Sequence, residues 1–206
     1  MRLNIPFIQS RGFECGQACA AMMVKYYRPD FTPNFDEINR IIHHLPGKYT
    51  FPPQLAMLLD NYDISTHVYS SDDIRKSSED PNQFKRWWGK DYKHEIKFLD
   101  LSSYDWMAES MRAKQLFTLR STNFSELLNH LDDGHLVGMP IDWRTITGKT
   151  GPYQGHFVVI SGVEGDNLLI HDPDIGPYQP HPISLIEKAW HHPAIANDYI
   201  LATGIK

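Results

Sequence analysis

The amino-acid sequence predicts an α+β fold, with several helices first and a mostly antiparallel sheet after them. Helix-like segments fill the first third of the chain, whereas the last third contains three short apolar strands, at 156–163, 167–171 and 198–203. Asp166-Asn167 between the first two strands is typical of a tight turn, so we expect these strands to form an antiparallel hairpin. Helices and strands are thus grouped rather than alternating, which favours an α+β architecture.

The helices near the start are predicted from apolar spacing and from residues that end helices. Residues 14–27 form an apolar run that Arg28-Pro29-Asp30 ends. Residues 34–45 place apolar side chains at helical spacing. A short third helix is expected over 54–61, after a proline pair that suits a first turn. Residues 64–69 then alternate like a strand.

The segment 70–118 differs in character from the rest of the chain. It is rich in charged residues and poor in valine and isoleucine, and it contains three of the five tryptophans. We expect it to be mostly helical, over about 81–90 and 103–115. The sequence therefore predicts a single domain, 1–206, in which 70–118 is a helical insertion or subdomain.

Four further elements are expected between this segment and the C-terminal strand. Residues 124–133 are predicted to be a helix, 135–142 a buried strand and 183–190 another helix. The threonine- and glycine-rich stretch 143–154 is predicted to be a mobile loop.

Composition and charge exclude several classes of protein. The 206 residues are 41% apolar, which is enough for one core, and the net charge of -5 does not favour a nucleic-acid partner. We find no apolar run of membrane-spanning length and no secretory signal. A cytoplasmic location is expected, although the sequence leaves export by a signal-independent route open.

Only two cysteines occur, Cys15 and Cys19, and they are one helical turn apart. A disulfide between them would strain the helix, so both are expected to be reduced thiols. We interpret Cys19 as a small core residue. Neither His-Glu-x-x-His nor Cys-x-x-Cys occurs, so we expect no metal and no cofactor.

Three residues have the chemistry of a nucleophile, its base and an orienting carboxylate. Cys15 opens a predicted helix, whose N-terminus stabilises a thiolate. His156 begins a strand, and Asp172 ends the next strand of the predicted hairpin, so the two are expected side by side. A carboxylate there can hold the imidazole tautomer. His171 is the alternative base, although it points to the opposite face of its strand.

A second group of residues is predicted to surround the reacting atoms. The side-chain amide of Gln9 and the backbone N–H of Cys15 are candidates for an oxyanion hole. Glu14 is interpreted as a charge at a helix N-terminus. The candidate substrate-binding residues are Gly16, Trp143, Tyr153 and Gly155.

At these positions the chain resembles a known family. Gln9, the run Glu14–Met22, the run Gly155–Val159 and the pair Asp172-Pro173 are similar to the bacteriocin-processing cysteine peptidases. Those are papain-like domains, often fused to ABC exporters, that cleave leader peptides after a double glycine. The resemblance implies a papain-like fold and the roles given above for Cys15, His156, Asp172 and Gln9. Family members typically have aspartate where this chain has Glu14, and we expect a stand-alone enzyme.

The favoured function is hydrolysis of peptide bonds in a peptide or protein substrate through a thioester on Cys15. The same thioester could pass to an amine, which would make the protein an acyltransferase, transpeptidase or deamidase. A third hypothesis is a peptide-binding module without catalytic activity. The sequence does not distinguish these three hypotheses, and it does not predict the oligomeric state.

Overall fold

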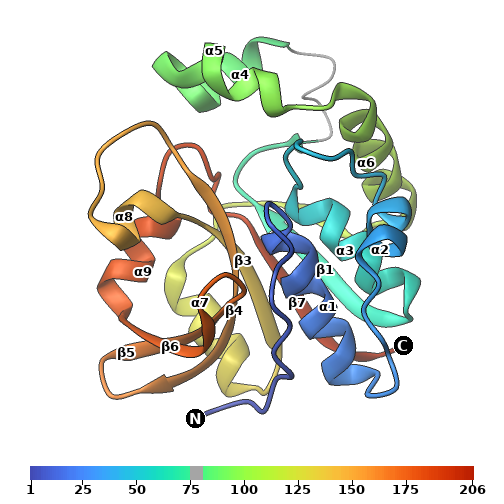
Figure 1. Cartoon of the computed structure of the whole chain (residues 1–206), viewed down its shortest axis with the longest axis vertical. Coiled ribbons are helices and arrows are strands. Elements are labelled where there is room, and N and C mark those ends of the chain that lie inside the picture. The colour runs from blue at the N-terminus through green and yellow to red at the C-terminus, as the bar shows by residue number, and fades with distance from the viewer. Residues whose placement is uncertain (75–80) are drawn as a thin grey trace.

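The computed structural model, which describes residues 1–74 and 81–206, confirms the α+β prediction (Figure 1). Its described residues form a seven-stranded sheet in the order β2-β1-β7-β3-β4-β5-β6. Every neighbouring pair is antiparallel except β1 and β2. The strands are β1 (Ile64–Ser70), β2 (Phe117–Leu119), β3 (Leu136–Asp142), β4 (Gly155–Glu164), β5 (Asn167–Asp172), β6 (Gly176–Pro182) and β7 (Tyr199–Ile205).

Helices cover both faces of this sheet. Two buried clusters are separated by it, one containing residues of α1, α3 and α6 and the other containing residues of α7 and α9. In Figure 1 the first set lies on the side of β1 and β7, and α7, α8 and α9 lie on the side of β4 to β6. The helices are α1 (Cys15–Tyr27), α2 (Phe35–Ile41), α3 (Pro52–Asn61), α4 (Pro81–Trp88), α5 (Tyr92–Glu95), α6 (Leu101–Lys114), α7 (Phe124–Asp132), α8 (Trp143–Thr147) and α9 (Ile183–Trp190).

The apolar run of β4 explains how one strand serves both layers. Phe157 and Val159 belong to the cluster on the α1 face, whereas Val158 and Ile160 belong to the opposite cluster. Successive side chains of a strand point to opposite faces, so a central strand with both faces covered is apolar throughout. Strand β4 is therefore packed on both faces, and His156 is its second residue.

Helix α1 packs closely on the sheet because its residues are small. Its buried residues include three alanines, and the Cys19 thiol donates to the Phe157 carbonyl oxygen at 3.2 Å. A Cβ at Gly16 would lie 3.0 Å from Leu55 Cδ1, so glycine permits the close approach of α3. This packing holds the N-terminus of α1 against the end of β4 that carries His156.

The structure corrects several boundaries. The helix expected over 34–45 ends at Ile41, after which His43 adopts a φ of 53°. The β4–β5 hairpin is confirmed, but Glu164 pairs with Asn167, so the turn lies at Gly165-Asp166, one residue earlier than expected. The stretch 143–154 is not a loop throughout, since its first five residues form α8.

The segment 70–118 contains the expected helices as α4 and α6, together with 3₁₀ turns at Gly89–Asp91 and Ile96–Phe98. Its side chains Phe84, Tyr104 and Met107 belong to the same buried cluster as α1 and α3. Its division from the rest of the chain as an insertion stays a prediction, and residues 75–80 lie outside the described residues. In the part that is described, no helix is long and apolar enough to cross a membrane.

Candidate active site

Cys15 is the first residue of α1, where backbone N–H groups have no partner within the helix. Cys15, Gly16 and Gln17 all line one cavity, so this helix end faces the cavity with its positive dipole. Glu14 does not cap the helix with its side chain, which instead accepts hydrogen bonds from Arg11 and Asn39. The positive end of α1 therefore faces the cavity at Cys15 without a side-chain cap.

His156 lies between the thiol and a buried carboxylate. Its Nε2 is 3.0 Å from Asp172 Oδ1, and the Cys15 side chain hydrogen bonds to the same imidazole. Because Nε2 faces Asp172, Nδ1 is the ring nitrogen left for the thiol. The oxygen that meets His156 also accepts the backbone N–H groups of Asp174 at 2.9 Å and Ile175 at 3.2 Å. This turn fixes the carboxylate, and the carboxylate fixes the imidazole.

The two ionised states support each other. Burial alone would lower the pKa of His156, but the hydrogen bonds to Asp172 and Cys15 and their charges raise it to about 10. Burial would raise the pKa of Asp172, but the hydrogen bond and charge of His156 and the backbone donors bring it below its usual value. The imidazole is therefore protonated at neutral pH and opposite a carboxylate, as a thiolate–imidazolium pair requires.

Two further side chains contact the imidazole. Asp174 Oδ2 lies 3.9 Å from Nδ1, and the Ser10 hydroxyl donates a hydrogen bond to the same carboxylate. The Trp143 ring packs against the His156 ring with centroids 4.7 Å apart. His156 is therefore enclosed by Asp172, Asp174 and Trp143, which leaves it little freedom to turn away from Cys15.

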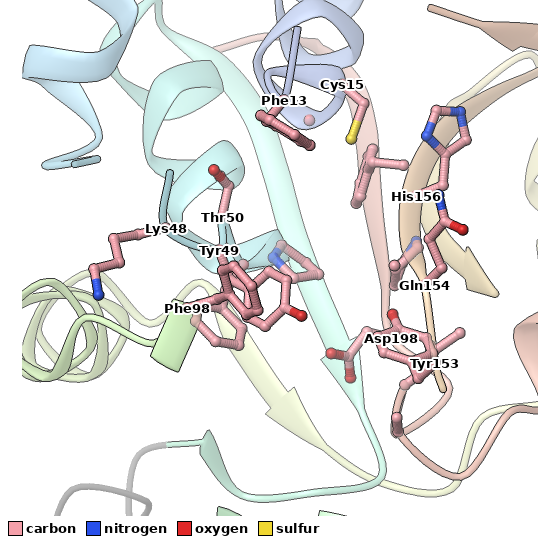
Figure 2. A pocket seen from close by; sticks show the side chains of 18 of the residues that line it. Phe13, Cys15, Lys48, Tyr49, Thr50, Phe98, Tyr153, Gln154, His156 and Asp198 are labelled. Carbon is pink, nitrogen blue, oxygen red and sulfur yellow. The ribbon is translucent and has the colours of Figure 1, made fainter. Parts of the chain in front are cut away.

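A cavity of about 680 Å³ extends from Cys15 and His156 to Asp198 (Figure 2). In this view Cys15 and His156 lie at one end, and Asp198 and Tyr153 lie at the other. Its walls come from the N-terminus of α1, the segment before α3, the helices of the 70–118 segment, the start of β4 and the residues before β7. Tyr49, Phe98 and Trp88 make one wall aromatic.

The loop before β4 is fastened by two charged side chains. Asp142 Oδ1 accepts the N–H of Gln154 at 3.1 Å, and its Oδ2 accepts from Thr145 N at 3.0 Å. Arg144 donates to the carbonyl oxygens of Pro152 and Thr150. These bonds hold Gln154 and Gly155 in the cavity wall beside His156. The loop therefore contributes fixed residues to the cavity.

The predicted substrate-binding residues are only partly brought together. Gly16, Tyr153 and Gly155 line the cavity, and the hydroxyl of Tyr153 lies so near Gly155 that a Cβ there would be 2.8 Å away. Trp143 contacts His156 and is not among the lining residues. Gln9 is exposed and does not line the cavity either, although its neighbour Ser10 bonds the backbone of Pro173. The roles of Gln9 and Trp143 stay predictions.

The alternative residues are occupied elsewhere. Both nitrogens of His171 are used by backbone groups, Nε2 by the Ile5 carbonyl at 3.0 Å and Nδ1 by the N–H of Tyr178 at 3.2 Å. Cys19 is buried, and burial raises the pKa of its thiol well above the usual value. These environments fit structural roles, and both cysteines are free thiols.

Sequence reasoning missed the far end of the cavity. Tyr49, Phe98 and Asp198 come from three distant segments, and no local motif marks any of them. Asp174 could have been predicted from the sequence, because the run Asp172-Pro173-Asp174 places a second carboxylate beside the first. Among the described residues one group has metal-binding composition, His130, Asp133 and His135, with ligand atoms within 4.8 Å of one another. It lies at the end of α7, and none of the three lines the cavity.

The comparisons with known proteins show the family to which the chain belongs. Residues 2–192 match the model of the Peptidase C39-like family, so the chain belongs to that family. The resemblance noted from the sequence is thereby confirmed at the level of the family. No protein of curated function matches the sequence significantly.

Three solved structures share the fold. A C39-like peptidase from Bacillus anthracis superposes with a TM-score of 0.57 at 16% identity, over 98% of this chain and 96% of that one. A double-glycine motif protease of an AMS/PCAT transporter, in complex with a leader peptide, gives 0.51 at 13% identity, over 98% and 93%. The peptidase domain of Streptococcus ComA, a bifunctional ABC transporter, gives 0.51 at 13%, over 96% and 97%. The papain-like fold is thus confirmed.

Proposed function

We propose that this protein is a cysteine peptidase that hydrolyses peptide bonds through a Cys15–His156–Asp172 triad. The observation that carries the proposal is the arrangement of the imidazole, which the Cys15 side chain meets on one side and buried Asp172 meets at 3.0 Å on the other. A helix N-terminus beneath the thiol and a cavity in front of it complete the site. The solved double-glycine protease with its leader peptide supports a peptide substrate by analogy.

The geometry supports a two-step mechanism. The Cys15 thiolate attacks the scissile carbonyl carbon, and the backbone N–H groups at the start of α1 stabilise the oxyanion. Imidazolium His156 gives its proton to the leaving amine as the carbon–nitrogen bond breaks, which leaves a thioester. Neutral His156 then takes a proton from water, whose oxygen attacks the thioester and releases the acid and the thiol. Asp172 holds the imidazole in the correct tautomer throughout.

The direct test is cleavage of a defined mixture of synthetic peptides, with products identified by mass spectrometry. The wild-type protein and Cys19→Ala should give the same products, whereas Cys15→Ala should give none. Cys19→Ala is the matched control because it removes a thiol from the same helix at a buried position. Cleavage that persists in folded Cys15→Ala would overturn the proposal.

An amine acceptor separates hydrolysis from acyl transfer. Hydrolysis predicts free carboxylic acids as products even when glycine amide is present at high concentration. A transferase would instead give peptides extended by glycine amide in the same experiment. A peptide-binding module without activity would retain bound peptide uncleaved in both the wild-type protein and Cys15→Ala.

A further inference from the structure

Asp198 lies at the end of the cavity away from Cys15, just before β7 (Figure 2). Its backbone is fixed, because its carbonyl oxygen accepts a hydrogen bond from the Trp190 indole at 2.8 Å and its N–H bonds the Ile195 carbonyl oxygen at 3.3 Å. The carboxylate points into the space between the aromatic wall and Tyr153. Its position is therefore set by the fold.

This carboxylate is incompletely satisfied. The Ser70 hydroxyl lies near it but donates to the Asp72 carbonyl oxygen at 3.0 Å, and Asp198 Oδ1 is buried and has no hydrogen-bond partner among the described residues. Burial raises the pKa of Asp198 to about 7, the nearby Ser70 hydroxyl opposes this shift, and the charge of Asp72 adds to it. In the described part of the chain, no lysine, arginine or histidine forms an ion pair with Asp198. A buried acid without a cation is costly to ionise.

The lysine and arginine side chains of the cavity wall already donate hydrogen bonds to backbone carbonyl oxygens. Lys48 Nζ donates to the carbonyl oxygen of Lys97 at 2.8 Å, and Arg144 donates to backbone carbonyls of its own loop. The surfaces between Cys15 and Asp198 are mostly aromatic, with Tyr49 and Phe98 on one side and Tyr153 on the other. The cavity thus offers apolar walls along its length and one carboxylate at its end.

We propose that Asp198 forms a specificity subsite that receives a lysine or arginine side chain of the peptide substrate. The inference rests on the proposed peptidase function and names its substrate class. A basic side chain has an aliphatic stem that packs on aromatic walls and a charged head that needs an anion. The head would also lie near the faces of tyrosine rings, which attract cations. Pairing with it supplies the cation that the Asp198 carboxylate lacks within the described protein.

The test uses synthetic peptide libraries that differ at one position only. Lysine is compared with norleucine, which has the same stem without the charge, and arginine is compared with citrulline. We expect the wild-type protein to prefer each basic residue at least tenfold in kcat/KM at one position relative to the scissile bond. Asp198→Asn should bring both ratios to within about twofold of one. Asp30→Asn, which removes one charge from an exposed site, should leave them unchanged.

The preference should also depend on pH in the wild-type protein and not in Asp198→Asn. As Asp198 loses its proton between about pH 6 and 8, the lysine-to-norleucine ratio should rise. The other titratable groups around this end of the cavity are Asp72, Glu95, Tyr49, Tyr153, His94 in the cavity lining and His192, which stacks on Tyr153. The tyrosine pKa values are raised out of this range, and the remaining groups act equally in Asp198→Asn, so the difference between the two proteins isolates Asp198. A ratio that is flat with pH, or equal cleavage of all four residues, would overturn the subsite.

Binding to Cys15→Ala separates failure of the subsite from failure of the proposed function. Affinity selection of the same libraries on this variant should enrich lysine and arginine, and the enrichment should disappear in Cys15→Ala/Asp198→Asn. Enrichment without cleavage by the wild-type protein would contradict the peptidase and keep the subsite. Cleavage without any basic preference would contradict the subsite and keep the peptidase.

Discussion

Two carboxyl groups, Asp172 beside His156 at one end of the cavity and Asp198 at the other end, have opposite electrostatic environments. Asp172 has His156 at 3.0 Å and two backbone donors, and its pKa is lowered despite burial. Asp198 has no ion-pair partner among the described residues, and burial raises its pKa to about 7, whereas an unpartnered buried oxygen is common to both groups. Burial acts in the same direction on both groups, so the difference comes from their partners.

The comparison shows that the described residues provide a cation for the carboxylate at one end of the cavity and none at the other. At the Cys15 end the imidazolium belongs to the protein, so the charges are complete before any substrate arrives. At the Asp198 end the described protein provides the anion alone. The predictions below test these two ends of the cavity in turn and then the two thiols of α1.

The largest effect is expected for Asp172→Asn. The amide removes the charge that stabilises imidazolium His156 and can hold the wrong tautomer, so kcat should fall on the order of 10²–10⁴-fold. Peptide cleavage at pH 7 measures this effect, and circular dichroism checks that the variant folds. Activity within threefold of wild type would show that the His156–Asp172 contact does not contribute to the chemistry.

The pH profile tests the same end without a substitution. Because Asp172 and Cys15 raise the pKa of His156 to about 10, cleavage should persist to that pH and then fall about tenfold per pH unit. The stability that the charged His156 contributes is complete below about pH 6.5 and is lost as the pH rises through 10. In Asp172→Asn the falling limb should begin at a lower pH. A wild-type limb near pH 7 would contradict the assigned contact.

At the other end, Asp198→Asn should change stability with a characteristic pH dependence. The raised pKa means that the folded state retains a proton that the unfolded state loses near pH 4, so Asp198 costs stability as the pH rises from about 4 to 7. At pH 8 the variant should be more stable than wild type by about 1–4 kcal/mol, and at pH 4 the difference should be small. Urea denaturation at both pH values measures it, and a variant less stable at pH 8 would contradict the interpretation.

The smallest effect is expected for Cys19→Ala, which tests the two thiols against each other. Cys19 is buried and donates to Phe157, so its loss should cost about 1 kcal/mol of stability and leave cleavage within twofold of wild type. Iodoacetamide should label Cys15 in the folded protein and leave Cys19 unmodified. Rapid labelling of Cys19 would show that α1 is less tightly packed than described.

The central elements were predictable because their signals are local. The apolar run of β4, the turn before β5 and the small residues of α1 each lie within a few positions of one another, and they place Cys15, His156 and Asp172 correctly. The edge strands were not predicted. Strand β6 contains Pro177, Pro180 and Pro182, and proline tells against a strand unless that strand lies at a sheet edge, as this one does.

The far end of the cavity could not be predicted for a different reason. Asp198, Tyr49 and Phe98 meet only after three separate segments have packed, and each residue taken alone resembles an ordinary surface residue. Gln9 shows the opposite problem. The family resemblance indicated a role for it in the site, whereas the structure leaves it exposed beside Ser10. Local patterns indicate elements and motifs, whereas the shape of a cavity depends on the packing between them.

The bond between Cys19 and Phe157 joins positions 138 residues apart, and it ties the helix of Cys15 to the strand of His156. Contacts of such long sequence separation form late, since the intervening chain must first be ordered. During synthesis the thiol therefore emerges early and remains without its imidazole until most of the chain has followed. A partly made or partly unfolded chain would have no assembled site, so the proposed peptidase activity would be confined to molecules that have finished folding.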